Sequence, residues 1–191
     1  YNPYIKSETF AYISKTLMEQ GEKEESLRVA SEITDGYGKS IAYLEILKIL
    51  IEQGKMKESQ EAMKESLKVA SVITNARNKT IAYREISKVL MEQGKMKESL
   101  KLASEITYEY NKSEAYRELS KILMEQGKMK ESLKVASDIT DDYDKSKAYR
   151  EISKVLMEQG KMKEAIQVAE NIKQGSEKLK AFIDFGKTPT F

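Results

Sequence analysis

The fold follows from a stretch that the chain repeats: KSEAYRELSKILMEQGKMKESLKVASDITDDYD, Lys112 to Asp144. The 33 residues before it, from Lys79, read KTIAYREISKVLMEQGKMKESLKLASEITYEYN. The copy that follows begins KSKAYREISKVLMEQGKMKEAIQVAENI at Lys145. A fixed period of this length is typical of a solenoid, in which each unit packs against its neighbours.

Each unit predicts two helices. In the copy from Lys79, apolar residues recur three and four apart from about Thr80 to Gln93, and Gly94 follows, as expected just past a helix end. A second amphipathic helix is expected from about Met96 to Ile106. Because so short a turn makes neighbouring helices antiparallel, each unit is expected to be a helical hairpin. We call its two helices A and B.

The whole chain predicts an all-α fold, a right-handed α-solenoid of about five antiparallel helical hairpins plus a C-terminal half-repeat helix. MEQG or a near copy ends at Gly21, Gly54, Gly94, Gly127 and Gly160, with spacings of 33, 40, 33 and 33. We expect one array over residues 1–191, with hairpins at about 6–36, 39–76, 79–109, 112–142 and 145–174 and a terminal helix at about 176–186.

The 40-residue spacing comes from a duplicated MKES, at Met56 and again at Met63. Seven residues are almost two helical turns, so the apolar face shifts by only about 20°. We therefore expect one long helix B from about Lys55 to Thr74, with roughly 10 Å of extra length protruding from the array edge.

The segment DGYGKSIAY, Asp35 to Tyr43, resembles a loop that cradles phosphate. Later copies replace Gly38 by Asn78, Asn111 and Asp144, and all of these residue types serve as helix N-caps. We therefore expect caps at these four positions and no nucleotide site.

These hairpins resemble tetratricopeptide repeats over nearly the whole chain. The aromatic near the start of that family's helix A matches Phe10, Tyr43, Tyr83, Tyr116 and Tyr149, and the large aliphatic three residues on matches Ile13, Ile46, Ile86, Leu119 and Ile152. Small residues match at Ser14, Ser87, Ser120 and Ser153 in helix A, and at Ser26, Ser59, Ser99, Ser132 and Ala165 in helix B. The period of 33, Leu47 in the second helix A and the missing proline at the end of helix B depart from the pattern. The resemblance implies a scaffold that binds proteins or peptides in a curved groove lined by helix A.

Composition excludes several classes of function. The chain has 33 basic and 31 acidic residues, a net charge of +2, which does not favour a nucleic-acid binder. It has no cysteine and no histidine, so it lacks disulfides, thiolate nucleophiles, the commonest general base and the commonest metal ligand. We expect no enzyme activity, no cofactor and no metal. No apolar run approaches the roughly 18 residues of a membrane span, so a soluble protein is expected, with a cytoplasmic location favoured. A start at Tyr1 rather than Met predicts a fragment or a processed form.

A basic ladder along helix A is the candidate binding site. It comprises Lys48, Arg84, Lys88, Arg117, Lys121, Arg150 and Lys154. Its expected ligand is an acidic peptide, and the alternative is RNA held by the same basic groove. Glutamates beside the arginines, at 85, 118 and 151, offer a third outcome, neutralisation from an adjacent repeat.

Two further features leave alternatives open. The recurrent Met18, Met91, Met124 and Met157 are compatible with an adaptable binding surface or with core packing. The half-repeat carries Leu179, Phe182, Ile183 and Phe185, and no helix B follows to cover it. We therefore expect self-association through the array ends, or a longer natural array.

Overall fold

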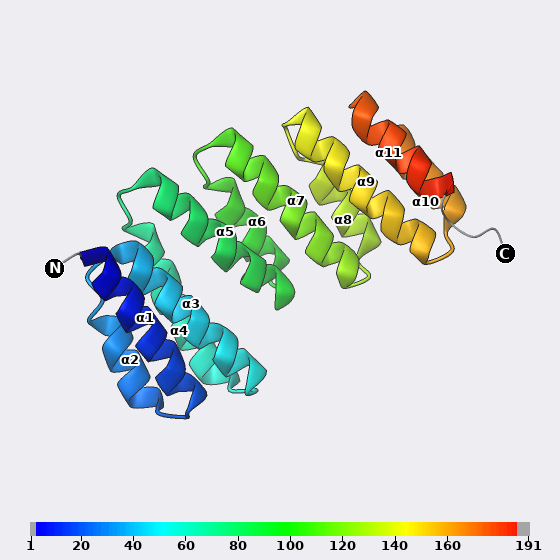
Figure 1. Cartoon of the computed structure of the whole chain (residues 1–191). Helices are drawn as coiled ribbons and strands as arrows, with labels where there is room; N and C mark the ends of the chain where they lie inside the picture. Colours follow the sequence, from blue (N-terminus) through cyan, green and yellow to red (C-terminus); the bar gives the residue numbers. More distant parts are fainter. Residues whose placement is uncertain (1–2, 187–191) are drawn as a thin grey trace. The chain divides into compact units, whose positions relative to one another are not determined.

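The structure, a computed structural model, describes residues 3–186 and contains eleven α-helices and no strand within them (Figure 1). This confirms the all-α helical repeat. The A helices have 17 residues each: α1 (Pro3–Glu19), α3 (Gly36–Glu52), α5 (Ala76–Glu92), α7 (Glu109–Glu125) and α9 (Asp142–Glu158). The B helices are α2 (Lys23–Ser31), α4 (Met56–Ser71), α6 (Met96–Ser104), α8 (Met129–Ser137) and α10 (Met162–Glu170), and α11 (Gly175–Gly186) is the half-repeat.

The chain divides into two compact units, residues 1–89 and 90–191. In the first unit, α1 packs against α2 and α3, and α3 against α4. In the second, α7 packs on α8 and α9 on α10, while α7, α9 and α11 lie side by side (Figure 1). Each unit thus stacks helical hairpins. One array over residues 1–191, and its handedness, remain predictions.

Each A helix ends at the glycine that the repeat predicts. Gly127 has φ 74°, and the other four glycines of this position are also left-handed. The N–H of Gly127 bonds the carbonyl oxygen of Met124 at 2.9 Å, and that of Lys128 bonds the carbonyl oxygen of Leu123 at 2.9 Å. This Schellman pair of bonds satisfies carbonyls that the helix itself leaves unpaired.

The predicted N-caps are wrong by three residues. Gly38, Asn78, Asn111 and Asp144 each lie at the third helical position rather than before the helix. In three of the four helices the backbone N–H at this position is capped by a side chain three residues earlier: Asp35 accepts from Gly38 N at 2.6 Å, Asn75 from Asn78 N at 3.0 Å, and Asp141 from Asp144 N at 2.9 Å. Tyr108, three residues before Asn111, makes no such bond. The A helices accordingly begin about three residues before the expected hairpin boundaries.

Small residues bring helices A and B close together. Ser120 of α7 donates its hydroxyl to the carbonyl oxygen of Ser132 in α8 at 3.0 Å, and Ser132 donates to the carbonyl oxygen of Ser120 at 2.7 Å. Ser14 and Ser26 make the same reciprocal pair in the first hairpin, at 2.9 and 2.6 Å. All four side chains are buried, so these bonds also satisfy hydroxyls that would otherwise be costly to bury.

The long helix B is continuous, as predicted, but its extra turns do not protrude. Helix α4 has 16 residues where α2 has 9, and it runs along α3. Within the added turns Met63 and Ser66 are buried, and Ser66 Oγ donates to the carbonyl oxygen of Ser40 at 3.0 Å. Because Ser40 lies near the start of α3, the added turns pack along that part of helix A.

Candidate functional site

The two arginines of the second unit on the predicted ladder are held by carboxylates of the next A helix. Arg117 of α7 donates from Nε to Asp144 Oδ1 and from Nη1 to Glu151 Oε1, each at 3.2 Å. The side chain of Asp144 is only 3% exposed. Arg117 therefore joins α7 to α9 and is not available as a surface cation.

Arg150 repeats this arrangement one unit later. Its Nη2 donates to Asp184 Oδ2 at 3.0 Å, and its Nη1 lies 3.5 Å from Glu177 Oε2. Glu177 occupies the register position of Asp144, and its side chain is 1% exposed. We call this arrangement the arginine clamp: an arginine of one A helix and two carboxylates of the next.

The pKa values of the two inner carboxylates, Asp144 and Glu177, are shifted in opposite directions. Burial raises the pKa of Asp144 above its ordinary value, and the attraction of Arg117 only partly opposes it. The negative charge of Asp141 adds to the effect of burial. Burial also acts upward on Glu177, but the 2.7 Å hydrogen bond from Lys180 and the charges of Lys180 and Arg150 hold its pKa below the ordinary value.

Lysines of the ladder in the first unit contact acidic neighbours on their own helix. Lys48 Nζ lies 2.8 Å from Glu45 Oε1, and Lys88 Nζ lies 3.0 Å from Glu85 Oε1. Arg84 Nε lies 3.8 Å from the same carboxylate oxygen of Glu85. These three ladder residues thus lie in an acidic setting, which weakens the expectation of a uniformly basic face.

Lys121 and Lys154 differ from the other ladder residues of the second unit because they line a groove. Their side chains are 61% and 59% exposed, and each reaches only to 3.9 Å from the glutamate one turn later. The groove lies between α7 and α9 and has a volume of about 250 Å³. Its lining consists of Ser120, Lys121, Met124, Glu125, Ala148, Glu151, Ile152, Lys154, Val155 and Glu158.

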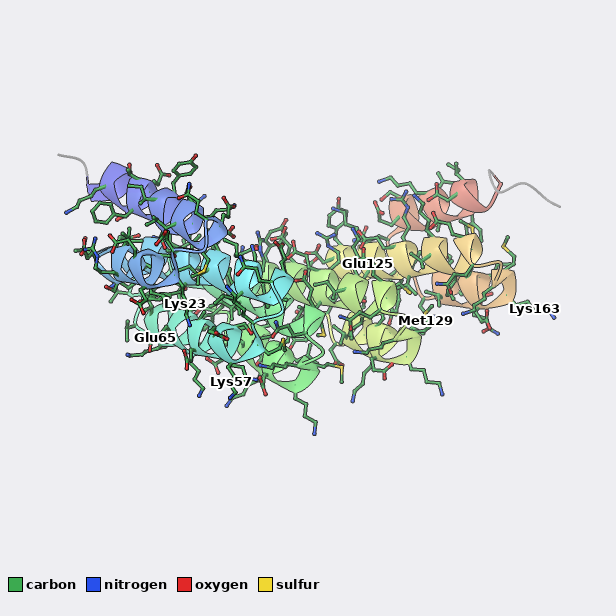
Figure 2. The ribbon with its side chains drawn as sticks, turned by 90° about the horizontal axis from the view of Figure 1, so that it is seen from below. Lys23, Lys57, Glu65, Glu125, Met129 and Lys163 are labelled. Carbon is green, nitrogen blue, oxygen red and sulfur yellow. The ribbon has the colours of Figure 1, made fainter. Side chains whose placement is uncertain are left out.

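The groove combines an apolar floor with a mixed-charge rim. Met124, Ala148 and Ile152 are buried and form the floor with Val155. Two lysines and the glutamates surround it, among them Glu125, which is labelled in Figure 2. Met124 is thus both core and groove lining, while Met18, Met91 and Met157 are buried.

The sequence raised neutralisation of the arginines by glutamates of an adjacent repeat, and Glu151 makes such a contact with Arg117, but Asp144, Glu177, Asp184 and the groove floor were missed. The signal for the clamp was present, because Asp144 and Glu177 stand 27 residues after Arg117 and Arg150, and Glu151 and Asp184 stand 34 after them. The spacing of 27 is six residues less than the 33-residue period, and the spacing of 34 is one residue more. Both acids therefore lie on the A helix of the next repeat. The floor carried no signal of its own, because its residues also belong to the repeated core pattern.

A second groove, of about 240 Å³, lies in the first unit beside the long helix. Its apolar residues are Leu27, Tyr43, Leu50 and Ala62, and its charged residues are Lys23, Glu58, Glu61 and Glu65. Lys23 of α2 lies 3.7 Å from Glu58 of α4, and Lys23 and Glu65 are labelled in Figure 2. Ala62, Glu61 and Glu65 come from the seven-residue insertion, so no other hairpin has these groups.

The repeated hairpin, its left-handed glycine and its facing small residues decide the architecture. The chain is an all-α repeat of helical hairpins with a TPR-like fold. No family model matches the sequence, and no curated protein matches it.

Several solved structures are similar to the chain in fold. They include a kinesin light chain of Podospora anserina with nearly identical TPR-like repeats, at 11% identity over 92% of this chain and 95% of the other, TM-score 0.48. They also include MamA of AMB-1, at 13% identity over 94% and 99%, TM-score 0.45. A third is YrrB, a TPR protein with an unusual peptide-binding site, at 16% identity over 91% and 90%, TM-score 0.43. These identities are too low to transfer a ligand or a residue role.

Residues 3–186 lack two features. No helix there combines the length and the apolar character needed to cross a bilayer. No group of three or more acidic side chains there lies close enough together to hold a metal ion.

Proposed function

We propose that the chain is a protein-interaction scaffold and that the groove between α7 and α9 binds an extended peptide segment of a partner. The observation that carries this proposal is an apolar floor flanked by two exposed lysines. Pockets that enclose a small molecule usually measure about 300–1,000 Å³. A groove of about 250 Å³ suits one apolar side chain of a peptide better than a whole ligand.

The preferred ligand has a carboxylate beside that apolar side chain. Lys121 and Lys154 lie 3.9 Å from Glu125 and Glu158, and all four side chains are about 60% exposed. Exposed pairs of this kind contribute only about 0–1 kcal/mol, so an incoming carboxylate can replace them at little cost. Arg117 and Arg150, in contrast, already bind two carboxylates each and offer little to a ligand.

RNA is not proposed as the ligand. A phosphate backbone needs a row of available cations, and electrostatic attraction supplies most of such binding. The arginines of the second unit are occupied by carboxylates, and three glutamates line the groove. These observations favour a peptide with a few acidic residues over a polyanion.

The proposal can be tested by a screen of displayed peptides against the full chain, followed by affinity measurements on two matched variants. The groove variant carries Lys121→Glu and Lys154→Glu. The control variant carries Lys130→Glu and Lys163→Glu, which change the net charge equally at exposed positions of helices α8 and α10 (Lys163 is labelled in Figure 2). We expect selected peptides with an acidic residue next to an apolar one, bound at least about tenfold more weakly by the groove variant alone.

Two results would contradict the proposal. One is equal weakening in both variants, which would indicate a general charge effect. The other is unchanged binding by a folded groove variant, which would move the site away from α7 and α9. The groove lined by the seven-residue insertion would then be the next surface to test.

A further inference from the structure

The two outermost A helices of the described chain lack opposite halves of the contacts that join internal repeats. Ile183 of α11 stands where α7 and α9 have Arg117 and Arg150, the arginines of the clamp. Tyr12 of α1 stands where α9 and α11 have the clamp acids Glu151 and Asp184. We call the side of an A helix that contacts the next repeat its forward face, and the side that contacts the preceding repeat its backward face. The forward face of α11 thus lacks the arginine of the clamp, and the backward face of α1 lacks the clamp carboxylate.

A second polar contact is also replaced by an apolar residue on α11. Ser113 of α7 and Ser146 of α9 each accept a hydrogen bond at 3.2 Å from the backbone N–H just before the next A helix. Leu179 stands at this register position in α11 and cannot accept such a bond. Leu179 and Ile183 are 62% and 47% exposed, so the face that internal repeats use for polar joining is apolar here.

The opposing face on α1 is apolar as well. Tyr12 is 71% exposed, and Ile13 beside it is exposed. The counterparts of Ile13 in the other A helices, Ile46, Ile86, Leu119 and Ile152, are all buried. The position of Ile13 is therefore one that a preceding repeat normally covers.

We propose that these two faces bind each other between two copies of the chain, α11 of one copy against the backward face of α1 of the next, in the register of an internal repeat junction. One internal A helix already has an aliphatic residue where α7 and α9 have the arginine of the clamp. Leu44 of α3 occupies the register position of Ile183 and is 1% exposed. In the proposed junction Ile183 and Leu179 pack against Tyr12 and Ile13, and apolar contact replaces the salt bridge of the internal junctions.

Such a contact is heterologous, because two different surfaces meet and both remain available at the ends of the assembly. Association should therefore not stop at a dimer. The mass measured by sedimentation equilibrium should rise steadily with concentration above the 21.8 kDa of one chain. The proposal does not depend on what the groove between α7 and α9 binds.

The test uses two variants of the full chain, Tyr12→Glu and Ile183→Glu. Each should reduce self-association by about tenfold or more, since a carboxylate would be buried against an apolar face. Mixed together, they should form a one-to-one complex and nothing larger. The unchanged α11 face of the first variant fits the unchanged α1 face of the second, while the other junction would bring two glutamates together.

A third variant tests the register. Tyr12→Glu combined with Ile183→Arg recreates the internal clamp pair across the junction and should restore association that Tyr12→Glu alone removes. Far-UV circular dichroism identical to the starting chain confirms that each variant is folded. A chain that stays monomeric at all concentrations would overturn the proposal. So would dimerisation of Tyr12→Glu alone, because it would indicate pairing of two α11 faces.

Discussion

Ser66 of α4 donates its hydroxyl to the carbonyl oxygen of Ser40 in α3 at 3.0 Å, one heptad beyond the position where other hairpins pair their serines. In those hairpins the paired residues are 12 apart, as in Ser120 and Ser132, whereas Ser40 and Ser66 are 26 apart. Leu47 occupies the usual helix A serine position in this hairpin. The duplicated MKES therefore supplies a new serine pair in a hairpin where leucine has replaced the usual helix A serine.

The first prediction concerns that pair. Ser66→Ala should lower the free energy of unfolding by about 1 kcal/mol, because it removes a buried hydrogen bond. Ser71→Ala, on the exposed part of the same helix, is the matched control and should change it by less than about 0.5 kcal/mol. Urea unfolding of both variants measures the difference. Equal effects would show that the Ser40–Ser66 bond adds no stability.

The second prediction concerns the insertion itself. Deleting Gln60 to Ser66 converts the sequence of α4 into that of α8, MKESLKVAS. Since seven residues nearly preserve helical phase, the chain should still unfold cooperatively. The deletion should lower the free energy of unfolding by about 2–5 kcal/mol, because it removes both the buried Met63 and the serine pair. A broad, non-cooperative thermal transition would contradict a simple helix extension.

The insertion also shows how far a repeat pattern predicts structure. The heptad spacing predicted one continuous helix, because phase depends only on residue count. Its protrusion was wrongly predicted because helix A turned out three residues longer at its start, with Asp35 rather than Gly38 outside the helix. The longer α3 offered a surface along which α4 could pack.

The candidate site was predicted only in part for a similar reason. Residue types along one helix identified a basic row, and Lys121 and Lys154 do line a groove. Whether a cation is available depends on the neighbouring helix, however. Arg117 binds Asp144 because Asp144 lies inside the next helix instead of capping it. The sequence pattern placed Asp144 at the cap position and therefore did not predict this contact.

The third prediction tests the clamp by removing its cation. Arg117→Met should destabilise the chain by about 3–5 kcal/mol, because Asp144 would remain buried without its partner. Adding Asp144→Asn should recover part of this loss, since an amide is less costly to bury than a carboxylate. Lys121→Met, on the same helix but exposed, is the control and should change stability by less than about 0.5 kcal/mol. Additive losses in the double variant would argue against a coupled pair.

The fourth prediction is that the two inner carboxylates of the clamp respond to pH in opposite directions. The pKa of Glu177 is lowered by folding, so its contribution is present above the unfolded value of about 4.3 and is lost as pH falls. The pKa of Asp144 is raised, so its contribution is present below the unfolded value of about 3.9 and is lost as pH rises through the folded pKa.

The corresponding measurement compares urea unfolding of Glu177→Gln and Asp144→Asn with the starting chain between about pH 3 and pH 7. The stability advantage of the starting chain over Glu177→Gln should grow with rising pH. Its advantage over Asp144→Asn should shrink over the same range. Parallel pH profiles for the two comparisons would show that the buried position of Asp144 does not outweigh the attraction of Arg117.

The fifth prediction concerns the junction between α1 and α3, where the clamp is absent. Ala11 stands at the position of Arg117 and Gly38 at that of Asp144, and a cavity of about 200 Å³ lies there. Glu8 and Asp35 are among the residues that line it. An arginine side chain placed at Ala11 would enter a space that already holds acidic groups.

Ala11→Arg should therefore raise the free energy of unfolding by about 0.5–2 kcal/mol, the range of a well-chosen cavity-filling change. Ala11→Met is the matched control, because it fills the same space without a charge. If the carboxylates contribute, the arginine variant should be the more stable at low salt, and its advantage should fall as the salt concentration rises. A chain made less stable by both changes would mean that close packing of α1 on α3 needs a small residue at this position. If only Ala11→Met raised the free energy of unfolding, the gain would come from filling the cavity with apolar atoms. Glu8 and Asp35 would then be too well hydrated to attract the guanidinium.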